Sequence, residues 1–269
     1  MTDKIPEFYI DAIYNVFHRV INIQYPTQRG SQNNVLFVKT ADGDFVAKFN
    51  TRDMVIKNYD VSHLARQNGI LAPDISIMGY KNTWFERYPL IQGKTLFERM
   101  KDGMPMPAIK RAFDEILTQF LHMDNLPIQN IRSNKCINVH DAVYANGRNT
   151  SGPVLARILM SCVYLMNRGR EHNVGLYHTE LTPKNVIVDE NGKLISLLDI
   201  DGMAICNRSF AFSVFADKWA QAGFDLNELY DKYEHMTGRK INRARINAML
   251  NTVHAGKYIM FHTNKNKIK

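Results

Sequence analysis

The chain has 269 residues, of which 45% are hydrophobic, 22% are charged and three are cysteines, and its formal net charge is +8. This apolar content suffices for one large domain or for two lobes that share a cleft. Cys136, Cys162 and Cys206 show no paired spacing, which argues against a disulfide framework and a zinc site. We expect reduced, partly buried thiols. No apolar run reaches the roughly 20 residues of a membrane span, and the N-terminus lacks a signal-peptide pattern, so we expect a cytoplasmic protein.

The positive charge is concentrated at the C-terminus. Residues 238–269 contain eight Lys or Arg and no Asp or Glu, so the rest of the chain has equal numbers of basic and acidic side chains. Such a segment could bind an anionic partner that carries phosphates, anionic lipid or acidic side chains. The alternative is a solvated helix with a frayed end. Nucleic-acid binding through this segment is a further hypothesis.

The first third of the chain predicts strands and one helix. Apolar runs with high β-propensity predict strands at 35–40, 44–49 and 84–90, and the first two flank an Ala-Asp-Gly turn, which is a hairpin signal. A helical pattern over 52–68 ends at Gly69, as helices commonly do.

The remainder predicts helices. Residues 109–121 repeat apolar side chains at helical spacing, and 153–167 are apolar nearly all round, which indicates a central buried helix. Three further helical segments are expected at 210–222, 225–236 and 242–258. The sequence therefore predicts an α+β protein, with a small β-rich N-lobe at 1–88 and a larger helical C-lobe at 89–269.

The stretch LYHTELTPKNVIVDENGKLISLLDIDG, residues 176–202, combines several polar side chains around a short hairpin. Strands are expected at 186–189 and 193–198, joined by Glu-Asn-Gly. The hairpin should bring 180–185 near 199–201. Two carboxylates and an Asn carbonyl would then converge, and such oxygen ligands suit Mg²⁺.

These motifs resemble those of the kinase fold. HTELTPKN, residues 178–185, resembles the catalytic loop H-x-D-x-x-x-x-N, and LLDIDG resembles the strand with the metal-binding Asp. The combination looks most like the aminoglycoside phosphotransferase and choline kinase branch. Upstream, FVAKF is similar to the third strand with its phosphate-binding lysine, Lys48, and LARQNGILAPDI is similar to the branch's helix-turn into a fourth strand. The resemblance covers roughly 25–205 and implies a bilobal protein-kinase-like fold.

The resemblance implies ATP and Mg²⁺ as cofactors. Asn185 and Asp199 would hold Mg²⁺ on the ATP phosphates, and Lys48 would anchor those phosphates. Asp201 would be either a second metal ligand or a structural hydrogen-bond acceptor. The polar stretch with Gly30 and Ser31 would cover the phosphates with backbone N–H groups.

The same resemblance assigns other roles around the two cofactors. Adenine would lie between the lobes, near the backbone of Tyr88. His178 would brace the catalytic loop from behind, and Lys184 is grouped with His178 and Glu180 as a catalytic candidate.

Two residues depart from the family pattern. Glu180 stands where the family has the Asp that receives the substrate proton. As a residue type, Glu has a carboxylate of nearly the same intrinsic pKa as Asp, but its extra methylene moves the oxygens by more than ~1 Å unless the backbone compensates, and such a misplacement can cost about 10²-fold in rate. Asn58 stands where a Glu should pair with Lys48, and could hydrogen-bond Lys48 without charge.

Two functions are therefore weighed for this sequence. One is an ATP/Mg-dependent phosphotransferase, or kinase, that acts on a hydroxyl of a small molecule or glycan. The alternative is a pseudokinase-type nucleotide-binding or scaffolding protein, because Glu180 replaces the catalytic Asp.

The sequence gives less information about the acceptor substrate than about the nucleotide. A basic C-lobe favours a neutral or anionic acceptor over a polycationic one. A choline acceptor would need an aromatic cage. Aromatic residues follow the hairpin, but their spacing is more typical of a helix core; they are Phe210, Phe212, Phe215, Trp219 and Phe224.

Overall fold

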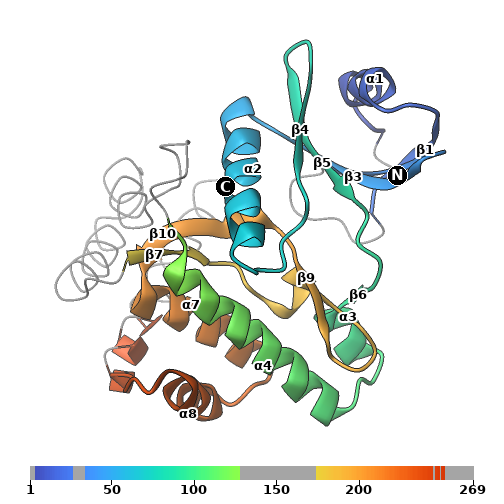
Figure 1. Ribbon diagram of the computed structural model, residues 1–269. Helices are drawn as coiled ribbons and strands as arrows, with labels where there is room; N and C mark the ends of the chain where they lie inside the picture. The colour runs from blue at the N-terminus through green and yellow to red at the C-terminus, as the bar shows by residue number, and fades with distance from the viewer. Residues whose placement is uncertain (1–3, 27–33, 128–173, 245, 249, 252–269) are drawn as a thin grey trace, which may run out of the picture. The chain divides into compact units, whose positions relative to one another are not determined.

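The computed structural model describes residues 4–26, 34–127, 174–244, 246–248, 250 and 251 (Figure 1). These residues form two compact units. Unit 1 contains the described residues up to Glu115 and the segment Val186–Asp201. Unit 2 contains 116–127, 174–185 and the described residues from Gly202 onward. The lobe boundary expected at residue 88 stays a prediction.

Unit 1 is built on a five-stranded antiparallel sheet with the order β1-β2-β3-β5-β4. Its strands are β1 (Val20–Gln24), β2 (Val35–Thr40), β3 (Gly43–Asn50), β4 (Ser76–Tyr80) and β5 (Thr83–Pro89). The three strands predicted from the sequence correspond to β2, β3 and β5, so these predictions are confirmed. The strand β1 was not predicted.

Two helices cover opposite faces of this sheet (Figure 1). The helix α1 (Glu7–Val16) packs through Ala12 and Ile13 on a core that includes Phe49 and Phe85. Since side chains alternate along a strand, Lys48 and Glu86 point to the opposite face, toward α2. The sheet face toward α2 therefore carries Lys48 and Glu86, whereas Arg87 of β5 lies on the other face, over the rings of Phe17 and Phe45.

The helix α2 (Arg52–Gln67) confirms the predicted helix and its end. Thr51 caps its N-terminus, because the Thr51 hydroxyl accepts a hydrogen bond from the Met54 backbone N–H at 3.4 Å. Gly69 follows with φ +77°, a left-handed conformation that glycine adopts without strain. The turn leads the chain into β4.

A smaller three-stranded sheet, with the order β6-β8-β9, completes unit 1. Its elements and the neighbouring helices are β6 (Lys94–Thr95), α3 (Leu96–Lys101), the first part of α4 (Met106–His122), β8 (Val186–Val188) and β9 (Leu194–Leu197). The predicted hairpin is confirmed as β8 and β9. At its turn Gly192 has φ +82°, and a Cβ there would lie 2.0 Å from the Ala108 carbonyl oxygen. Only glycine lets the hairpin approach α4 this closely.

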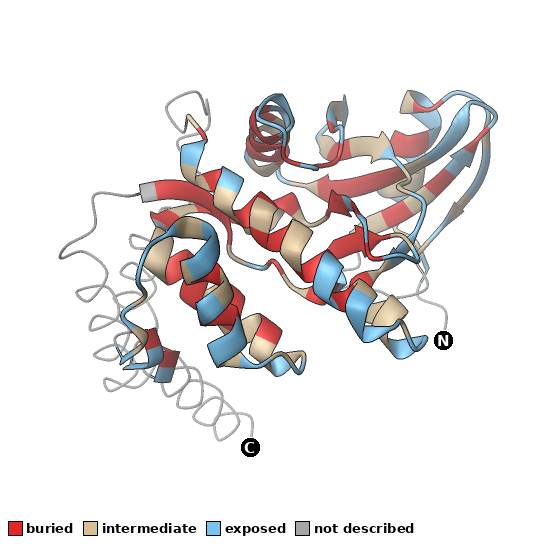
Figure 2. Cartoon of the chain, turned by 60° about the horizontal axis from the view of Figure 1, so that its bottom comes forward, coloured by how far each residue is buried: buried red, intermediate tan, exposed pale blue. Residues whose placement is uncertain are grey.

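Unit 2 pairs a short antiparallel sheet with helices. Its elements are η1 (Met123–Asn125), β7 (Val174–His178), η3 (Pro183–Asn185), β10 (Met203–Asn207), α7 (Arg208–Gln221) and α8 (Leu226–Thr237), and η4 (Ile200–Gly202) lies at the boundary between the units. The helices α7 and α8 were both predicted. Figure 2 shows buried residues along the strands and the packed helix faces, with exposed residues on loops and outer helix faces.

The aromatic residues of α7 form core. Four of them are at most 8% exposed: Phe210, Phe212, Phe215 and Trp219. Phe224 is half-buried and contacts Trp219 edge-on, with ring centroids 5.0 Å apart. The helix-core interpretation of these residues is therefore confirmed, and the alternative of a choline-binding cage loses its basis.

A buried ionic group connects three elements of unit 2. Asp124 accepts a hydrogen bond from the Tyr177 hydroxyl, and its Oδ2 lies 2.6 Å from the Arg208 Nε. Burial and this hydrogen bond raise the pKa of the Tyr177 phenol. The group ties η1 and β7 to the start of α7.

The described part of the basic C-terminal segment is paired with acidic side chains. Lys240 Nζ lies 2.9 Å from Glu234 Oε2, and Arg243 contacts Asp231. Arg239 lies 3.7 Å from Asp124. These three charges are therefore partly neutralised within unit 2.

Several sequence predictions fall outside the described residues. These are the phosphate-covering loop with Gly30 and Ser31, Cys136, Cys162, the helix at 153–167 and the end of the helix at 242–258. Cys206 lies within the described residues. Its thiol is free and fully buried, and burial raises its pKa to about 12. The expectation of a buried thiol is confirmed for Cys206, which forms no disulfide within the described residues. In the part of the chain that the structure describes, no helix could span a membrane.

Candidate functional site

Lys48 is the centre of the charged cluster in unit 1. Its Nζ lies 2.7 Å from Oδ1 of Asp199 and 2.9 Å from Oδ2 of Asp201, although Lys48 and Asp199 are 151 residues apart in the sequence. Burial lowers the pKa of Lys48, but the carboxylates of Asp201 and Asp199 outweigh burial, and the pKa lies above its ordinary value. The third strand and the Asp-Ile-Asp segment thus meet, as the sequence motifs led us to expect. We call Lys48, Asn58, Glu86, Asp199 and Asp201 the Lys48 cluster.

Asp199 has an unusual backbone conformation. It lies between the end of β9 and the turn η4, with φ +57°. For a residue other than glycine the left-handed region costs on the order of 1 kcal/mol, and such strain persists only where neighbouring contacts hold it. The carboxylate of Asp199 is 37% exposed, whereas that of Asp201 is 25% exposed. Asp199 is therefore the more accessible of the two carboxylates.

Asn58 is bound to carboxylates. Its side-chain nitrogen donates to Oε1 of Glu86 at 2.6 Å and to Oδ1 of Asp201. Among the described contacts no hydrogen bond joins Asn58 to Lys48, so the bond considered from the sequence is not the one observed. The side-chain oxygen of Asn58 is buried and accepts no hydrogen bond within the described residues. Asn58 thus connects α2 to Asp201 and to β5.

Glu86 is a member of the Lys48 cluster that was not predicted from the sequence. Glu86 lies opposite Lys48 in the β3–β5 pairing and is 2% exposed. Burial and the nearby charge of Asp201 raise the pKa of Glu86 to about 8, against the lowering effects of Lys48 and of the hydrogen bond from Asn58. Its signal in the sequence was the single acidic residue of a strand that also contains three aromatic residues. That pattern indicates a buried carboxyl group with a specific partner.

Lys57 was missed as well. It is fully buried on α2, and its Nζ donates to the backbone carbonyl of Asp201 at 3.0 Å. Asn50, at the end of β3, adds a long contact of 3.5 Å to Oδ2 of Asp201. Polar residues on the buried side of α2 were the available signal. Asp201 is therefore held through its carbonyl and both carboxylate oxygens.

In unit 2 the 178–185 loop is anchored at its start by β7. His178 pairs with Met203 of β10 and is 1% exposed, and its Nδ1 accepts the Glu180 backbone N–H at 3.2 Å. Thr179 donates to the Gly202 carbonyl through both its backbone N–H and its hydroxyl, each at 2.9 Å. Glu180 itself is exposed. The exposed carboxylate of Glu180 is therefore attached to a backbone that hydrogen bonds hold in place.

The second half of the loop is held by α7 and by Asn185. Trp219 donates from Nε1 to the Leu181 carbonyl at 2.9 Å, and Asn185 donates from Nδ2 to the Glu180 carbonyl at 2.8 Å. This bond leaves Oδ1 of Asn185 as the atom that can face a cation. Lys184 is exposed.

The oxygen donors fit Mg²⁺. In unit 1 the carboxylate of Asp199 is the accessible oxygen donor, because both carboxylate oxygens of Asp201 accept from protein groups. Carboxylate and carbonyl oxygens are the ligands of Mg²⁺, which usually takes only one or two carboxylates and completes its shell with water and phosphate. The described residues contain no group of three or more His, Cys, Asp or Glu side chains that could hold a metal. Asp199 fits the role of one such carboxylate ligand.

Tyr88 shares a sheet face with Lys48 and Glu86. It is half-buried and lies opposite Val46. The Leu90 N–H donates to the Asp44 carbonyl at 2.8 Å, and since hydrogen-bonded pairs alternate along an antiparallel ladder, the backbone groups of Tyr88 also point to β3. A backbone contact to adenine would therefore come from beyond the paired part of β5.

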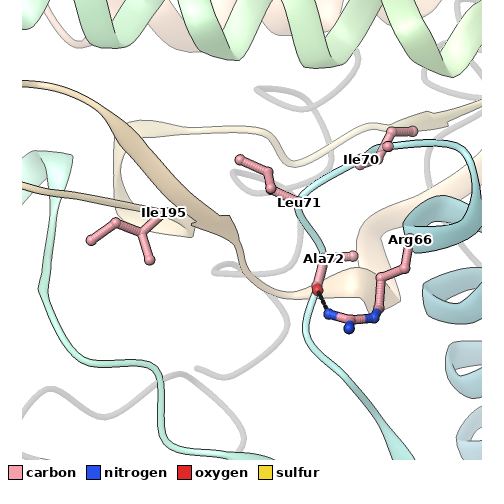
Figure 3. Close-up of a pocket in the computed structure, with 6 residues that line it drawn as sticks. Arg66, Ile70, Leu71, Ala72 and Ile195 are labelled. Atoms are coloured by element: carbon pink, nitrogen blue, oxygen red, sulfur yellow. Dashed lines mark hydrogen bonds between the residues drawn. The ribbon is translucent and has the colours of Figure 1, made fainter.

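A separate small pocket of about 280 Å³ lies in unit 1 beside β9 (Figure 3). Its lining is mostly aliphatic, and Arg66 donates to the Ala72 carbonyl at its edge. The lining residues are Arg66, Gly69, Ile70, Leu71, Ala72 and Ile195. None of them belongs to the Lys48 cluster, so we assign the pocket no part in the candidate site.

Comparisons with known proteins find likeness in structure only. No family model matches the chain, and no curated protein matches it. Among solved structures, an aminoglycoside-3'-phosphotransferase of type VIII aligns with a TM-score of 0.64 and 12% identity, over 91% of this chain and 98% of the other. The GDP complex of aminoglycoside 2'-phosphotransferase-IIIa aligns with a TM-score of 0.60 and 15% identity, over 94% and 98%.

A third structure is aminoglycoside phosphotransferase APH(3'')-Id from Streptomyces rimosus in complex with ADP and streptomycin. Its TM-score is 0.57 at 13% identity, over 81% of this chain and 88% of the other. At these identities the likeness establishes the fold. The chain has the protein-kinase-like α+β fold of the aminoglycoside phosphotransferases, which confirms the fold class and the resemblance predicted from its motifs.

Proposed function

We propose that the protein is an ATP- and Mg²⁺-dependent phosphotransferase that acts on a hydroxyl of a small molecule or glycan. The observation that carries the proposal is the contact of Lys48 with Asp199 at 2.7 Å, because it unites a phosphate-binding lysine with a metal-binding carboxylate. The solved structures of the same fold include complexes with GDP and with ADP, which supports nucleotide binding.

The residues take the following roles in this proposal. Lys48 would bind the nucleotide phosphates, and Asp199 and Asn185 would each be a ligand of Mg²⁺, which would supply positive charge for the transferred group. Asp201, with all its oxygens engaged by protein donors, acts chiefly as the anchor of its segment. Glu180 receives the proton of the acceptor hydroxyl, and His178 fixes the Glu180 backbone. Catalysis rests on positioning and charge.

The proposal extends to partners and location. We infer an acceptor that is neutral or anionic, and an anionic partner for the basic segment 238–269. We also propose a cytoplasmic location, where ATP and Mg²⁺ are supplied. These three inferences rest on sequence charge and composition alone.

Calorimetric titration with Mg²⁺-ATP and Mg²⁺-GTP tests the proposal. We expect saturable binding that Asp199→Ala weakens at least tenfold, because the metal loses a carboxylate ligand. Asp42→Ala, which removes an exposed carboxylate at the β2–β3 turn, is the control and should bind as the wild type does. The proposal fails if the wild type binds neither nucleotide, or if Asp199→Ala binds equally well.

A pseudokinase-type scaffold is the second candidate, favoured by Glu180 at the position of the catalytic Asp. Glu180→Asp distinguishes the two functions. Turnover on a panel of acceptors, followed by ATP consumption, is expected to rise on shortening the side chain, because the carboxylate regains the family position. Nucleotide binding without turnover by either protein would support the scaffold.

A further inference from the structure

The helix α2 contacts Asp201 at two points. Lys57 donates to its backbone carbonyl at 3.0 Å, and Asn58 donates to its carboxylate. Both side chains are fully buried. In the family pattern this helix would contact Lys48 through a Glu. Here the described contacts of these two α2 residues with the Lys48 cluster run to Asp201 and Glu86.

Lys57 is costly to bury. An ammonium group that leaves water loses its hydration, and the loss is tolerated where hydrogen bonds and nearby negative charge replace it. Asp201 supplies a carbonyl acceptor at 3.0 Å and a charged side chain on the same residue. The hydrogen bond from Lys57 therefore fixes the Asp201 backbone relative to α2.

Asp199 lies two residues before this anchor. The turn η4 (Ile200–Gly202) begins directly after it, and Asp199 has the left-handed φ of +57°. A carbonyl held at the second residue of the turn limits how the turn can rotate. Releasing that carbonyl would let Asp199 return to the broad allowed region and move its carboxylate.

We propose that Lys57 is a positioning residue that couples α2 to the 199–201 segment and so sets where the Asp199 carboxylate stands. Helix α2 then orients the metal ligand, whereas in the family pattern it orients the lysine. This inference deepens the proposed function, and it rests on that function for its metal readout.

The direction in which Mg²⁺ affinity changes when Lys57 loses its charge separates a positioning role from a purely electrostatic one. Lys57→Met keeps the length of the side chain and removes the ammonium. The loss of a positive charge near two aspartates would by itself strengthen the binding of a cation. The loss of position would weaken it, because a displaced ligand no longer completes the metal shell.

The first experiment titrates Mg²⁺ at fixed ATP and compares it with ATP binding in EDTA. For Lys57→Met we expect at least a tenfold loss in Mg²⁺ affinity and less than a twofold change in metal-free ATP affinity. Lys57→Gln, which keeps an N–H donor on a shorter side chain, should show a smaller loss in the same direction. Lys39→Met is the control, because Lys39 is exposed on β2 and carries the same charge. Unchanged or tighter Mg²⁺ binding, or equal losses with and without metal, would overturn the proposal.

The second experiment needs no ligand. Hydrogen exchange followed by mass spectrometry should show amides 199–203 exchanging at least tenfold faster in Lys57→Met, while amides 36–48 of the sheet exchange as in the wild type. Equal exchange at 199–203, or parallel acceleration across both segments, contradicts positioning. A wild type that fails to bind Mg²⁺-ATP would refute the proposed function and leave this exchange test in force.

Discussion

Glu86→Gln tests the electrostatics of the Lys48 cluster. The carboxyl group is 2% exposed, and burial raises its pKa from 4.5 to about 8. The amide of Gln has the same shape and can still accept the hydrogen bond from Asn58. Its N–H₂ group could also donate to the buried Asn58 oxygen, which has no described donor. The substitution therefore removes the titration and keeps the packing.

The direction of the pH dependence follows from how tightly Glu86 binds a proton in the folded and unfolded states. Glu86 binds a proton more tightly in the folded state than in the unfolded state, so its contribution to stability is fully present below pH 4.5 and is lost as pH rises through 8. This is opposite to an Asp or Glu whose folded pKa is depressed. At about 1.4 kcal/mol per unit of pKa, the ionisation cost grows by ~3 kcal/mol between about pH 5.5 and 8.5.

Urea unfolding of the wild type and Glu86→Gln across that pH range measures this cost. We expect the free-energy difference between the two proteins to shift by ~3 kcal/mol in favour of the variant from the acidic to the alkaline end. Glu7→Gln, the same change at an exposed residue of α1, is the matched control for the loss of a carboxylate at the surface. A pH-independent difference for Glu86→Gln would refute the reasoning, because the buried carboxyl would then be ionised at every pH tested.

Three further predictions concern unit 2. Gly202→Ala should destabilise the protein by about 1 kcal/mol in urea unfolding, because an added Cβ would lie 3.2 Å from the His178 ring; equal stability would show that the ring can retreat. Trp219→Phe should cost about 2 kcal/mol in the same assay, since the buried Leu181 carbonyl loses its donor; a cost near zero would mean that the hydrogen bond is dispensable. Cys206 should resist iodoacetamide in the native protein and react after denaturation, as followed by mass spectrometry, because burial raises its pKa to about 12; rapid native labelling would contradict its burial.

The sequence predicted the parts whose signals are local. The helix before Gly69, the strands on either side of Ala-Asp-Gly and the hairpin at 186–198 depend on turn residues and short periodicities, and all were found. The kinase-like motifs predicted the fold because their order along the chain is specific. The strand β1 was missed because it lies at the sheet edge, where three of its five residues are exposed and its alternation is weak.

The roles of Glu86 and Lys57 depended on the tertiary structure. Glu86 is one charged residue in a strand and Lys57 one lysine in a helix, and the chain around them gives no partner. Their environment arises when β3, β5, α2 and the 199–201 segment pack together, because a desolvated charge takes its pKa and its hydrogen bonds from neighbours distant in sequence.

Asn58 shows the same division. In the sequence, Asn58 occupies the position where the family pattern has a Glu that pairs with Lys48. The packing of α2 gave it Glu86 and Asp201 as partners. The sequence by itself therefore determined the fold and the set of polar groups, since turn chemistry, periodicity and motif order act over short stretches. Tertiary structure alone decided which of those groups bind one another, because hydrogen bonds and Coulomb interactions act over a few ångströms of space whatever the separation along the chain.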